Sequence, residues 1–449
     1  MKRSMRRAAI AAVVVVAGLA AGGLWYLRGP GPMAFASGQK VALADYDGAD
    51  PTGVPASLAD ASLVERGAYL ARAADCMVCH TAPGGRDYAG GLAFRLPFGT
   101  LRSTNITPDV DTGIGAYSDA QFLDAVQRGV RRDGARLYPA MPYTSYRYMS
   151  DADALAIKAY LFSLPPVQAT APPNTLAFPF DQRWGMMFWS ALFSPDTGFE
   201  PDSARTPEWN RGAYIAEALA HCGDCHTPRN VAFALDNRRK YGGARTAGWQ
   251  AYNITSDRQT GLGGWSDGDI ASYLATGYAE GRGTASGPMG EAVDHSLSKL
   301  AQEDIAALVT YLRSVPAIRS TDLPASLAPP APASHRDGVD HANALGRKVF
   351  EGACVSCHGW TGESSLSPFA TLVGTRAVND PSGTNVAQVV ISGTVRHTPP
   401  GVISMPAFGD AYSNDEIAAV ANYVTQRFGG AAAGLTEQDV AALRNETAD

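Results

Sequence analysis

The sequence CMVCH at residues 76–80 decides how this chain folds, because the same spacing of two cysteines and a histidine returns twice. It returns as CGDCH at residues 222–226 and as CVSCH at residues 354–358. These three copies use all 6 cysteines of the chain. No cysteine is left over, so whatever chemistry the motif serves is carried out three times.

The CxxCH pattern is the attachment signature of c-type haem. Two thiols one helical turn apart can each form a thioether to one porphyrin, and the following imidazole then reaches the iron. Disulfides would leave the repeated histidine unexplained, a thioredoxin-like site would need one CxxC near a βαβ pattern, and zinc sites would need further ligands. We therefore predict three covalently bound haem c groups. The expected attachment residues are Cys76, Cys79, Cys222, Cys225, Cys354 and Cys357, with His80, His226 and His358 as iron ligands.

A methionine beside a proline follows each motif. Met141, Met289 and Met405 lie 61, 63 and 47 residues after the histidine of their own motif. An electron-transfer haem needs a second axial ligand, and a thioether raises its reduction potential. A lone methionine is usually core filler, but this repeated placement, with proline holding the loop extended, predicts these three as sixth iron ligands. His295 and His397 are the alternative ligands, and no residue is expected to be catalytic.

The surroundings of the first two motifs are duplicated. RGAY at residues 66–69 recurs at 211–214, and Asn105 recurs as Asn253. Such self-similarity indicates a repeated structural unit. The two asparagines either hydrogen-bond near a haem propionate or only brace a turn. Each unit, including a shorter and more divergent third one, is expected to close on an amphipathic helix, at residues 150–164, 301–315 and 413–428.

Shifts in composition divide the chain. Residues 319–338 are rich in proline and alanine and indicate a linker, and the linker at 166–205 holds a dense aromatic run at 178–193. That run is either a connector packed between units or a docking face for a partner subunit or the membrane surface. The expected order is an anchor or signal segment at 1–30, a spacer at 31–60, three haem-binding units at 61–165, 206–318 and 339–430, and a tail at 431–449.

The first residues carry a targeting signal. Four basic residues precede an uncharged apolar run of 20 residues at 8–27. A helix of this length crosses a hydrocarbon core of about 30 Å, with its positive end in the cytoplasm. We expect an uncleaved transmembrane anchor, and the alternative is a signal peptide cleaved near Ala34-Phe35-Ala36. Both interpretations place the rest of the chain outside the cytoplasm.

Composition excludes several other classes of protein. The chain has 449 residues, of which 45% are hydrophobic, and its net charge is −6. Disorder over the whole chain is therefore excluded, and the absence of a basic block after the first residues argues against binding nucleic acid. Only one stretch is apolar enough to span a bilayer, so a transporter with several spans is excluded.

The chain resembles the three-haem cytochrome c subunits of membrane-bound periplasmic dehydrogenases of the acetic-acid-bacterium type. The resemblance is carried by STNITP at 103–108, YPAMPY at 138–143 and HCGDCHTPR at 221–229. It implies a mainly α fold of three tandem class I cytochrome c-like domains beside the transmembrane helix. It also implies an electron relay at the periplasmic face of the inner membrane, from a catalytic subunit through three haems to ubiquinone.

The third unit bears on the identity of the catalytic partner. ACVSCHGWTG at 353–362 and RAVNDP at 376–381 are similar to the branch that serves molybdopterin-dependent aldehyde dehydrogenases, which also have a small iron–sulfur subunit. The alternatives are pyrroloquinoline-quinone alcohol dehydrogenase and flavin-dependent gluconate or sugar dehydrogenase. Two alternatives come from other classes of protein. A haem enzyme needs an open axial site, and a methionine for each haem argues against one. A terminal oxidase subunit is the other alternative.

Overall fold

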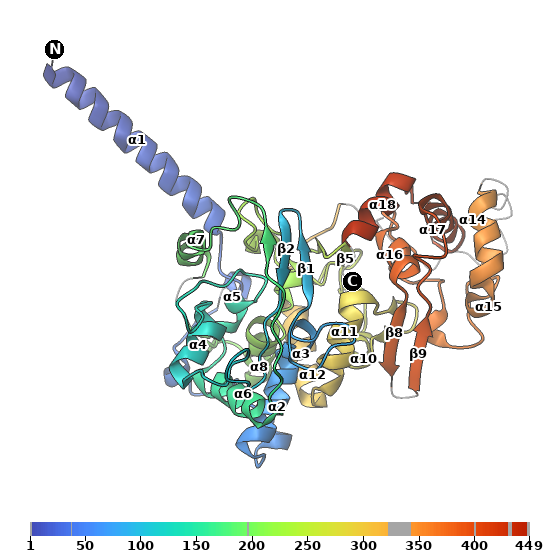
Figure 1. The fold of residues 1–449 in the computed structure, drawn as a ribbon, viewed down its shortest axis with the longest axis horizontal. Coiled ribbons are helices and arrows are strands. Elements are labelled where there is room, and N and C mark those ends of the chain that lie inside the picture. Colours follow the sequence, from blue (N-terminus) through green and yellow to red (C-terminus); the bar gives the residue numbers. More distant parts are fainter. Residues whose placement is uncertain are drawn as a thin grey trace.

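Three pairs of packed helices form the framework of the protein (Figure 1). The computed structural model describes residues 2–36, 38–194, 197–321, 343–398, 401–429 and 433–446. Each pair joins the helix that leads into a CxxCH motif to the helix that closes the same unit. The pairs are α2 (Leu63–Ala73) with α6 (Asp151–Ser163), α8 (Pro207–Tyr214) with α12 (Gln302–Ser314), and α14 (Ala344–Val349) with α17 (Asn414–Phe428).

A glycine at each helix crossing lets the two backbones touch. A Cβ atom placed on Gly67, Gly212 or Gly346 would lie 1.9, 1.9 or 2.2 Å from a carbonyl oxygen of the closing helix. Real Cβ atoms do not approach a carbonyl so closely, so only glycine fits at these positions. The three expected units therefore share one packing device.

Shorter helices fill the space around these pairs. Serine caps fix several of their starts, since the hydroxyls of Ser118 and Ser266 accept from the backbone N–H three residues later. The other α-helices of the described residues are α3 (Cys76–Cys79), α4 (Asp119–Arg128), α5 (Tyr143–Tyr146), α7 (Gly185–Phe193), α9 (Gly223–His226), α10 (Asp267–Thr276), α11 (Gly287–His295), α15 (Val355–His358), α16 (Thr384–Ser392) and α18 (Glu437–Glu446). Two π-helical turns, η4 (Ile215–Leu219) and η8 (Phe350–Cys354), precede the second motif and lead into the third.

The strands are short and antiparallel. One sheet has the order β1-β2-β3, and the other strands form two-stranded hairpins. Within the described residues the protein is therefore mainly helical, as predicted. The strands are β1 (Ala93–Leu96), β2 (Gly99–Arg102), β3 (Thr175–Leu176), β4 (Ala244–Thr246), β5 (Trp249–Ala251), β6 (Tyr278–Ala279), β7 (Gly283–Thr284), β8 (Thr394–Thr398) and β9 (Gly401–Met405).

The first and second units share one continuous apolar core. Leu70 and Ile157 of the first unit and Ile215 and Leu308 of the second all belong to it, and each is at most 3% exposed. The third unit has a separate core around Phe350. The first two units thus bury their apolar faces against each other as well as within themselves.

Helix α1 (Lys2–Arg28) extends away from the body of the protein (Figure 1). Across the residues that the structure describes, no helix combines the length and apolar character needed to cross a membrane. The expected N-terminal transmembrane helix is therefore wrong. The physical reason is composition, because ten of the 20 residues from 8 to 27 are alanine or glycine, and such small side chains gain little free energy on leaving water.

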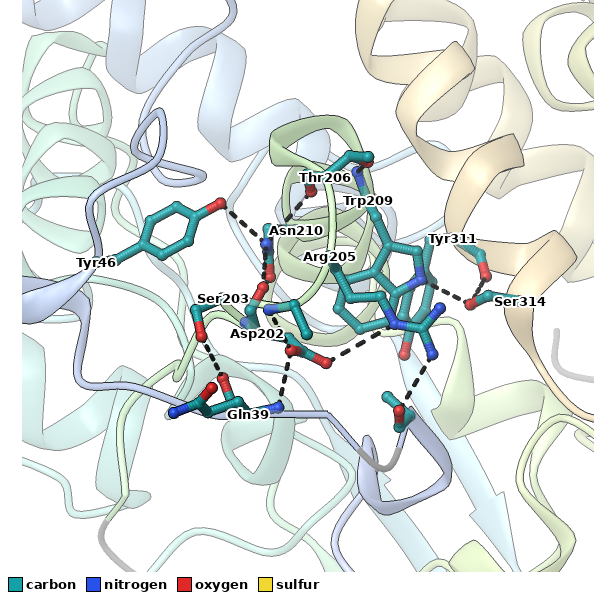
Figure 2. A network of polar contacts seen from close by, with 12 residues as sticks. Gln39, Tyr46, Asp202, Ser203, Arg205, Thr206, Trp209, Asn210, Tyr311 and Ser314 are labelled. Atoms are coloured by element: carbon teal, nitrogen blue, oxygen red, sulfur yellow. Dashed lines mark hydrogen bonds and ion pairs between the residues drawn. The ribbon is translucent and has the colours of Figure 1, made fainter.

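The segment expected as a spacer, residues 31–60, packs against the second unit. Figure 2 shows the backbone of Gln39 beside the carboxylate of Asp202 and the ring of Tyr46 pointing at Asn210. The Gln39 N–H donates to Asp202 Oδ1 at 3.0 Å, and Asn210 Nδ2 donates to the Tyr46 hydroxyl at 3.1 Å. Met33 lies in the shared core. These contacts tie the base of α1 to the body of the protein.

Two other expected segments are described only in part. Most of the linker at 319–338 lies in residues 322–342, outside the described residues, and so does part of the tail at 431–449. The described part of the tail forms α18, which packs against α16 and α17.

Candidate functional site

The three CxxCH histidines share one hydrogen bond. In each, Nδ1 lies 2.6 Å from a backbone carbonyl oxygen. A carbonyl can only accept, so the ring proton sits on Nδ1 and the lone pair of Nε2 is free to bind a metal. Burial also lowers the pKa of all three imidazoles, which favours the neutral form that binds iron. The pairs are His80 with Thr104, His226 with Tyr252, and His358 with Ala370.

The six cysteines lie in or beside the short helices that carry the motifs, and none of them is paired in a disulfide. Burial raises the pKa of Cys76 to about 12 and that of Cys354 to about 11. These two thiols are therefore uncharged at neutral pH. An uncharged sulfur among apolar side chains is suited to a thioether, which carries no charge either.

The three methionines lie in the same cores as the cysteines of their motifs. Met141 and Met289 pack against the shared core together with Cys76 and Cys222, and Met405 packs against the third core together with Cys354. The sequence predicted an extended loop around each methionine. In two units the methionine lies in regular structure instead, because Met289 is in the first turn of α11 and Met405 is at the end of β9.

The alternative ligands lie elsewhere. His295 is exposed in the last turn of α11, and the side chain of His397 is 63% exposed in β8. Both imidazoles therefore face solvent, whereas the methionines are partly buried. In each unit two thiols are available to attach a porphyrin, and one imidazole nitrogen and one methionine sulfur are available as donors to its iron, so the residues present fit haem c.

Asn105 and Asn253 brace turns. The Asn105 amide donates to Thr112 Oγ1 and the Val167 carbonyl, and its oxygen accepts from the N–H and hydroxyl of Thr107. Asn253 makes the same four bonds in the second unit. Since an amide has two donors and two lone pairs, nothing is left for a haem propionate, and of the two expected roles the turn is the one observed.

The first two candidate sites lie against each other. Helix α11, which carries Met289, packs on α3 of the first unit, and α5, just after Met141, packs on η4 of the second. The Ser145 hydroxyl donates to Asp224 Oδ2 at 3.1 Å, and the Tyr146 ring lies 5.5 Å from the His221 ring. Each unit thus places a helix that contains its methionine or directly follows it beside the CxxCH region of the other unit.

Two tyrosines form hydrogen bonds across the boundary between these units, and the sequence did not predict them. The Tyr69 hydroxyl donates to Asp304 and the Tyr214 hydroxyl to Asp153, each at 2.6 Å. The available signal was that the tyrosine of RGAY and an aspartate at the start of the closing helix both recur. Recurrence alone does not show that the partners come from different units.

A buried charged cluster lies beside the second motif. Glu217, in the π-helical turn η4, is 3% exposed and accepts from Lys240 Nζ at 2.6 Å. The hydroxyls of Tyr241 and Tyr311 donate to its other oxygen at 2.7 and 2.6 Å. The wider π-turn aims this glutamate inward, where the lysine and two hydroxyls satisfy its charge.

Several polar contacts join the second and third units, and two of them come from elements of the second unit's candidate site. The carbonyl of Tyr252 accepts from His226, while its hydroxyl donates to Asp380 Oδ2 at 3.1 Å. Arg396 of β8, 1% exposed, donates to Asp294 of α11 at 2.8 Å. The second unit therefore contacts both of the others through elements of its candidate site.

Comparison with protein-family models matches two parts of the chain. Residues 64–165 match the model described as cytochrome c, and residues 341–424 match the model described as cytochrome c oxidase, cbb3-type, subunit III. The first and third units thus each carry a recognised cytochrome domain.

Comparison with curated proteins finds relatives along most of the chain. The fructose dehydrogenase cytochrome subunit of Gluconobacter japonicus is 38% identical over 88% of this chain and 85% of its own length. The gluconate 2-dehydrogenase cytochrome c subunit of Pantoea cypripedii is 38% identical over 86% of this chain and 91% of its own length. A nicotinate dehydrogenase subunit of Pseudomonas putida is 40% identical over 82% of this chain, which spans only 30% of that longer protein.

Proposed function

Because the chain belongs to the family of cytochrome c subunits of dehydrogenases, we propose that it relays electrons from a periplasmic catalytic subunit to ubiquinone in the inner membrane. Cytochrome c domains hold covalently bound haem c, and the proposal assigns three of these groups to the chain. The observation that carries it is the 2.6 Å contact from Nδ1 to a carbonyl in all three units. That contact leaves one imidazole nitrogen free for iron in each unit.

The residues have separate tasks in this proposal. The group that they hold supplies a reversible one-electron change of its iron. The carbonyls of Thr104, Tyr252 and Ala370 fix the orientation of the three imidazoles. The methionine sulfurs raise the reduction potential, and the apolar cores keep water away from the iron, which also affects its potential.

We place the second unit in the middle of the relay. Its helix α11 packs on α3 of the first unit, and its Tyr252 reaches Asp380 of the third. Electrons moving between the outer units then pass through the second, whichever outer unit receives them first.

For the catalytic partner we propose a molybdopterin subunit with a small iron–sulfur subunit that oxidises an aldehyde. The support is the third-unit sequence at 353–362 and 376–381. The alternatives are quinoprotein alcohol dehydrogenase and flavin-dependent gluconate or sugar dehydrogenase, and the names of relatives favour them, since these relatives serve alcohol, gluconate and fructose dehydrogenases. A terminal oxidase subunit is supported by the family match of residues 341–424 alone.

The test is optical. The protein is isolated from native membranes in mild detergent with whatever co-purifies, and the reduced haem α-band is recorded after addition of an aldehyde, an alcohol, gluconate or fructose to separate samples. Rapid reduction by the aldehyde alone supports the molybdopterin partner. Reduction by one of the others alone replaces it with the matching alternative. Oxidation by added ubiquinone tests the acceptor, and failure of ubiquinone to reoxidise the haems would overturn that step.

A further inference from the structure

Three segments far apart in sequence form one exposed aromatic surface. They are the end of α1 at residues 24–28, the run at 178–193 that includes α7, and the loop at 230–239. Large apolar side chains from all three are exposed to solvent: Trp25 by 76%, Phe178 by 79%, Trp184 by 66%, Phe188 by 62% and Val231 by 87%. We call this set of segments the aromatic surface.

Direct contacts hold the aromatic surface together. Hydrogen bonds and ring contacts connect each segment to the next. Asn230 Nδ2 donates to the Leu27 carbonyl at 2.9 Å, Trp189 Nε1 donates to the Ala232 carbonyl at 2.8 Å, and the rings of Phe180 and Phe233 lie 6.4 Å apart. These contacts therefore fix the positions of the three segments, and of their exposed side chains, relative to one another.

Helix α7 presents an apolar stripe outward. Trp184, at its N-cap, and Met187, Phe188 and Ala191 are exposed, and they follow the i, i+3, i+4, i+7 spacing of one helical face. Ser190, which lies outside this stripe, is buried. A helix whose outward face is apolar is suited to an apolar environment, yet nine residues rise only about 14 Å and cannot cross a bilayer core of about 30 Å.

Arginines surround the aromatic side chains. Arg28, Arg183, Arg238 and Arg239 lie in the same three segments, against two acids, Asp181 and Asp236. The Arg238 guanidinium lies 4.2 Å from the ring of Tyr26, and that of Arg183 lies 4.8 Å from the ring of Tyr138. Amphipathic aromatic rings with arginines at their edge are the composition of surfaces that enter the headgroup region of anionic membranes.

We propose that the aromatic surface docks on an anionic lipid bilayer, with α7 lying in the plane of the interface. This deepens the proposed function and rests on its membrane location. The apolar stripe then enters the boundary between headgroups and acyl chains, and the arginines meet lipid phosphates. Such docking brings the first and second units close to a membrane-dissolved electron acceptor.

The test is hydrogen–deuterium exchange of the full-length haem-loaded protein, alone and with vesicles of phosphatidylglycerol and phosphatidylethanolamine. We expect amides of α7 to exchange several-fold more slowly on vesicles. The variant Trp184→Ser/Phe188→Ser should lose this protection. The matched control is Val395→Ser/Val402→Ser, which removes two exposed apolar side chains, 59% and 64% exposed, from the β8–β9 hairpin and should keep it.

Each other outcome overturns the proposal in a distinct way. Vesicle binding without protection of α7 overturns the docking surface and leaves the membrane location standing. Equal protection on phosphatidylcholine vesicles overturns the anionic preference. Protection that rises with protein concentration in the absence of lipid identifies a second copy as the occupant. Haem reduction by a dehydrogenase substrate is measured separately, so a failed relay is recognised independently of these results.

Discussion

The hydroxyl of Tyr69 lies 2.6 Å from Oδ2 of Asp304, across the boundary between the first and second units. The same bond recurs in the opposite direction, from Tyr214 to Asp153, also at 2.6 Å. Each hydroxyl also accepts the backbone N–H at the N-cap of the closing helix in the other unit. The two units are thus related by an approximate two-fold exchange, which explains why they share one core.

Removing one exchanged hydroxyl should destabilise the pair of units. Tyr69→Phe or Tyr214→Phe deprives a buried carboxylate of a donor, and we expect a loss of about 1–3 kcal/mol in the free energy of unfolding. Thermal and denaturant unfolding measure it. Tyr88→Phe is the matched control, because its hydroxyl lies 3.5 Å from that of Tyr160 and makes only a weak bond. An equal loss in the control would show that the exchange has no special role.

Replacing a glycine at a helix crossing by alanine should lower the free energy of unfolding, unlike the same replacement at an open position. In Gly212→Ala the new Cβ meets a carbonyl at 1.9 Å, so the helices must separate, at a cost of about 1–3 kcal/mol or more. Gly268→Ala is the control, since that glycine lies in α10 with only Ser266 Oγ near, at 3.7 Å. It should stabilise the protein by about 0.5–1 kcal/mol. Denaturant unfolding should therefore show a lower free energy of unfolding for Gly212→Ala and a higher one for Gly268→Ala.

Replacing a single axial methionine should change one haem of three. Met141→Leu, Met289→Leu and Met405→Leu each remove a thioether, so one reduction potential should fall while the other two stay in place. Spectroelectrochemical titration with a far-red absorption spectrum resolves this. Met187→Leu, on the exposed face of α7, is the control and should change none. Three unchanged titrations would refute the axial assignment.

Removing the charge of Glu217 beside the second motif should lower the free energy of unfolding. Glu217→Gln leaves the buried Lys240 without its anion, 2.6 Å away in the native protein, and we expect a loss of about 3–5 kcal/mol. The double variant Glu217→Gln/Lys240→Met should recover part of it, because no unpaired charge remains buried. Denaturant unfolding of both variants gives the comparison, and no recovery in the double variant would argue against a charge effect.

The link between the second and third units should weaken in acid. Burial by itself raises the pKa of Asp294, but hydrogen bonds from Arg396 and from the His397 N–H outweigh it and hold the pKa below its usual value. The stabilisation is therefore complete above the unfolded pKa of about 3.9 and is lost as the pH falls through the lower folded value.

Asp294→Asn should accordingly be less stable than the native protein at pH 7, and the difference should shrink below about pH 4. Thermal unfolding as a function of pH measures it. Asp410→Asn, an exposed acid of the third unit, is the control and should show no such trend. A difference that stays constant into acid would assign the effect of Asp294→Asn to packing instead of charge.

The sequence by itself determined that the chain contains cytochrome c domains. The spacing of Cys76, Cys79 and His80 is local, so it predicts attachment without any knowledge of the fold. The repeats predict a duplicated unit, and the family resemblance implies a mainly helical chain of cytochrome domains. The axial methionines and the count of three haems remain predictions. The expectation of an N-terminal transmembrane helix was wrong, because no helix among the described residues is long and apolar enough to cross a membrane.

Only the tertiary structure decided how the units meet. Tyr69 and Asp304 are 235 positions apart in the sequence, and nothing local distinguishes a tyrosine that bonds within its unit from one that bonds across. The same holds for Gln39 and Asp202, which join the expected spacer to the body, and for the three segments of the aromatic surface. Covalent and axial ligation depend on spacing along the chain, whereas interfaces depend on which buried faces fit each other in space.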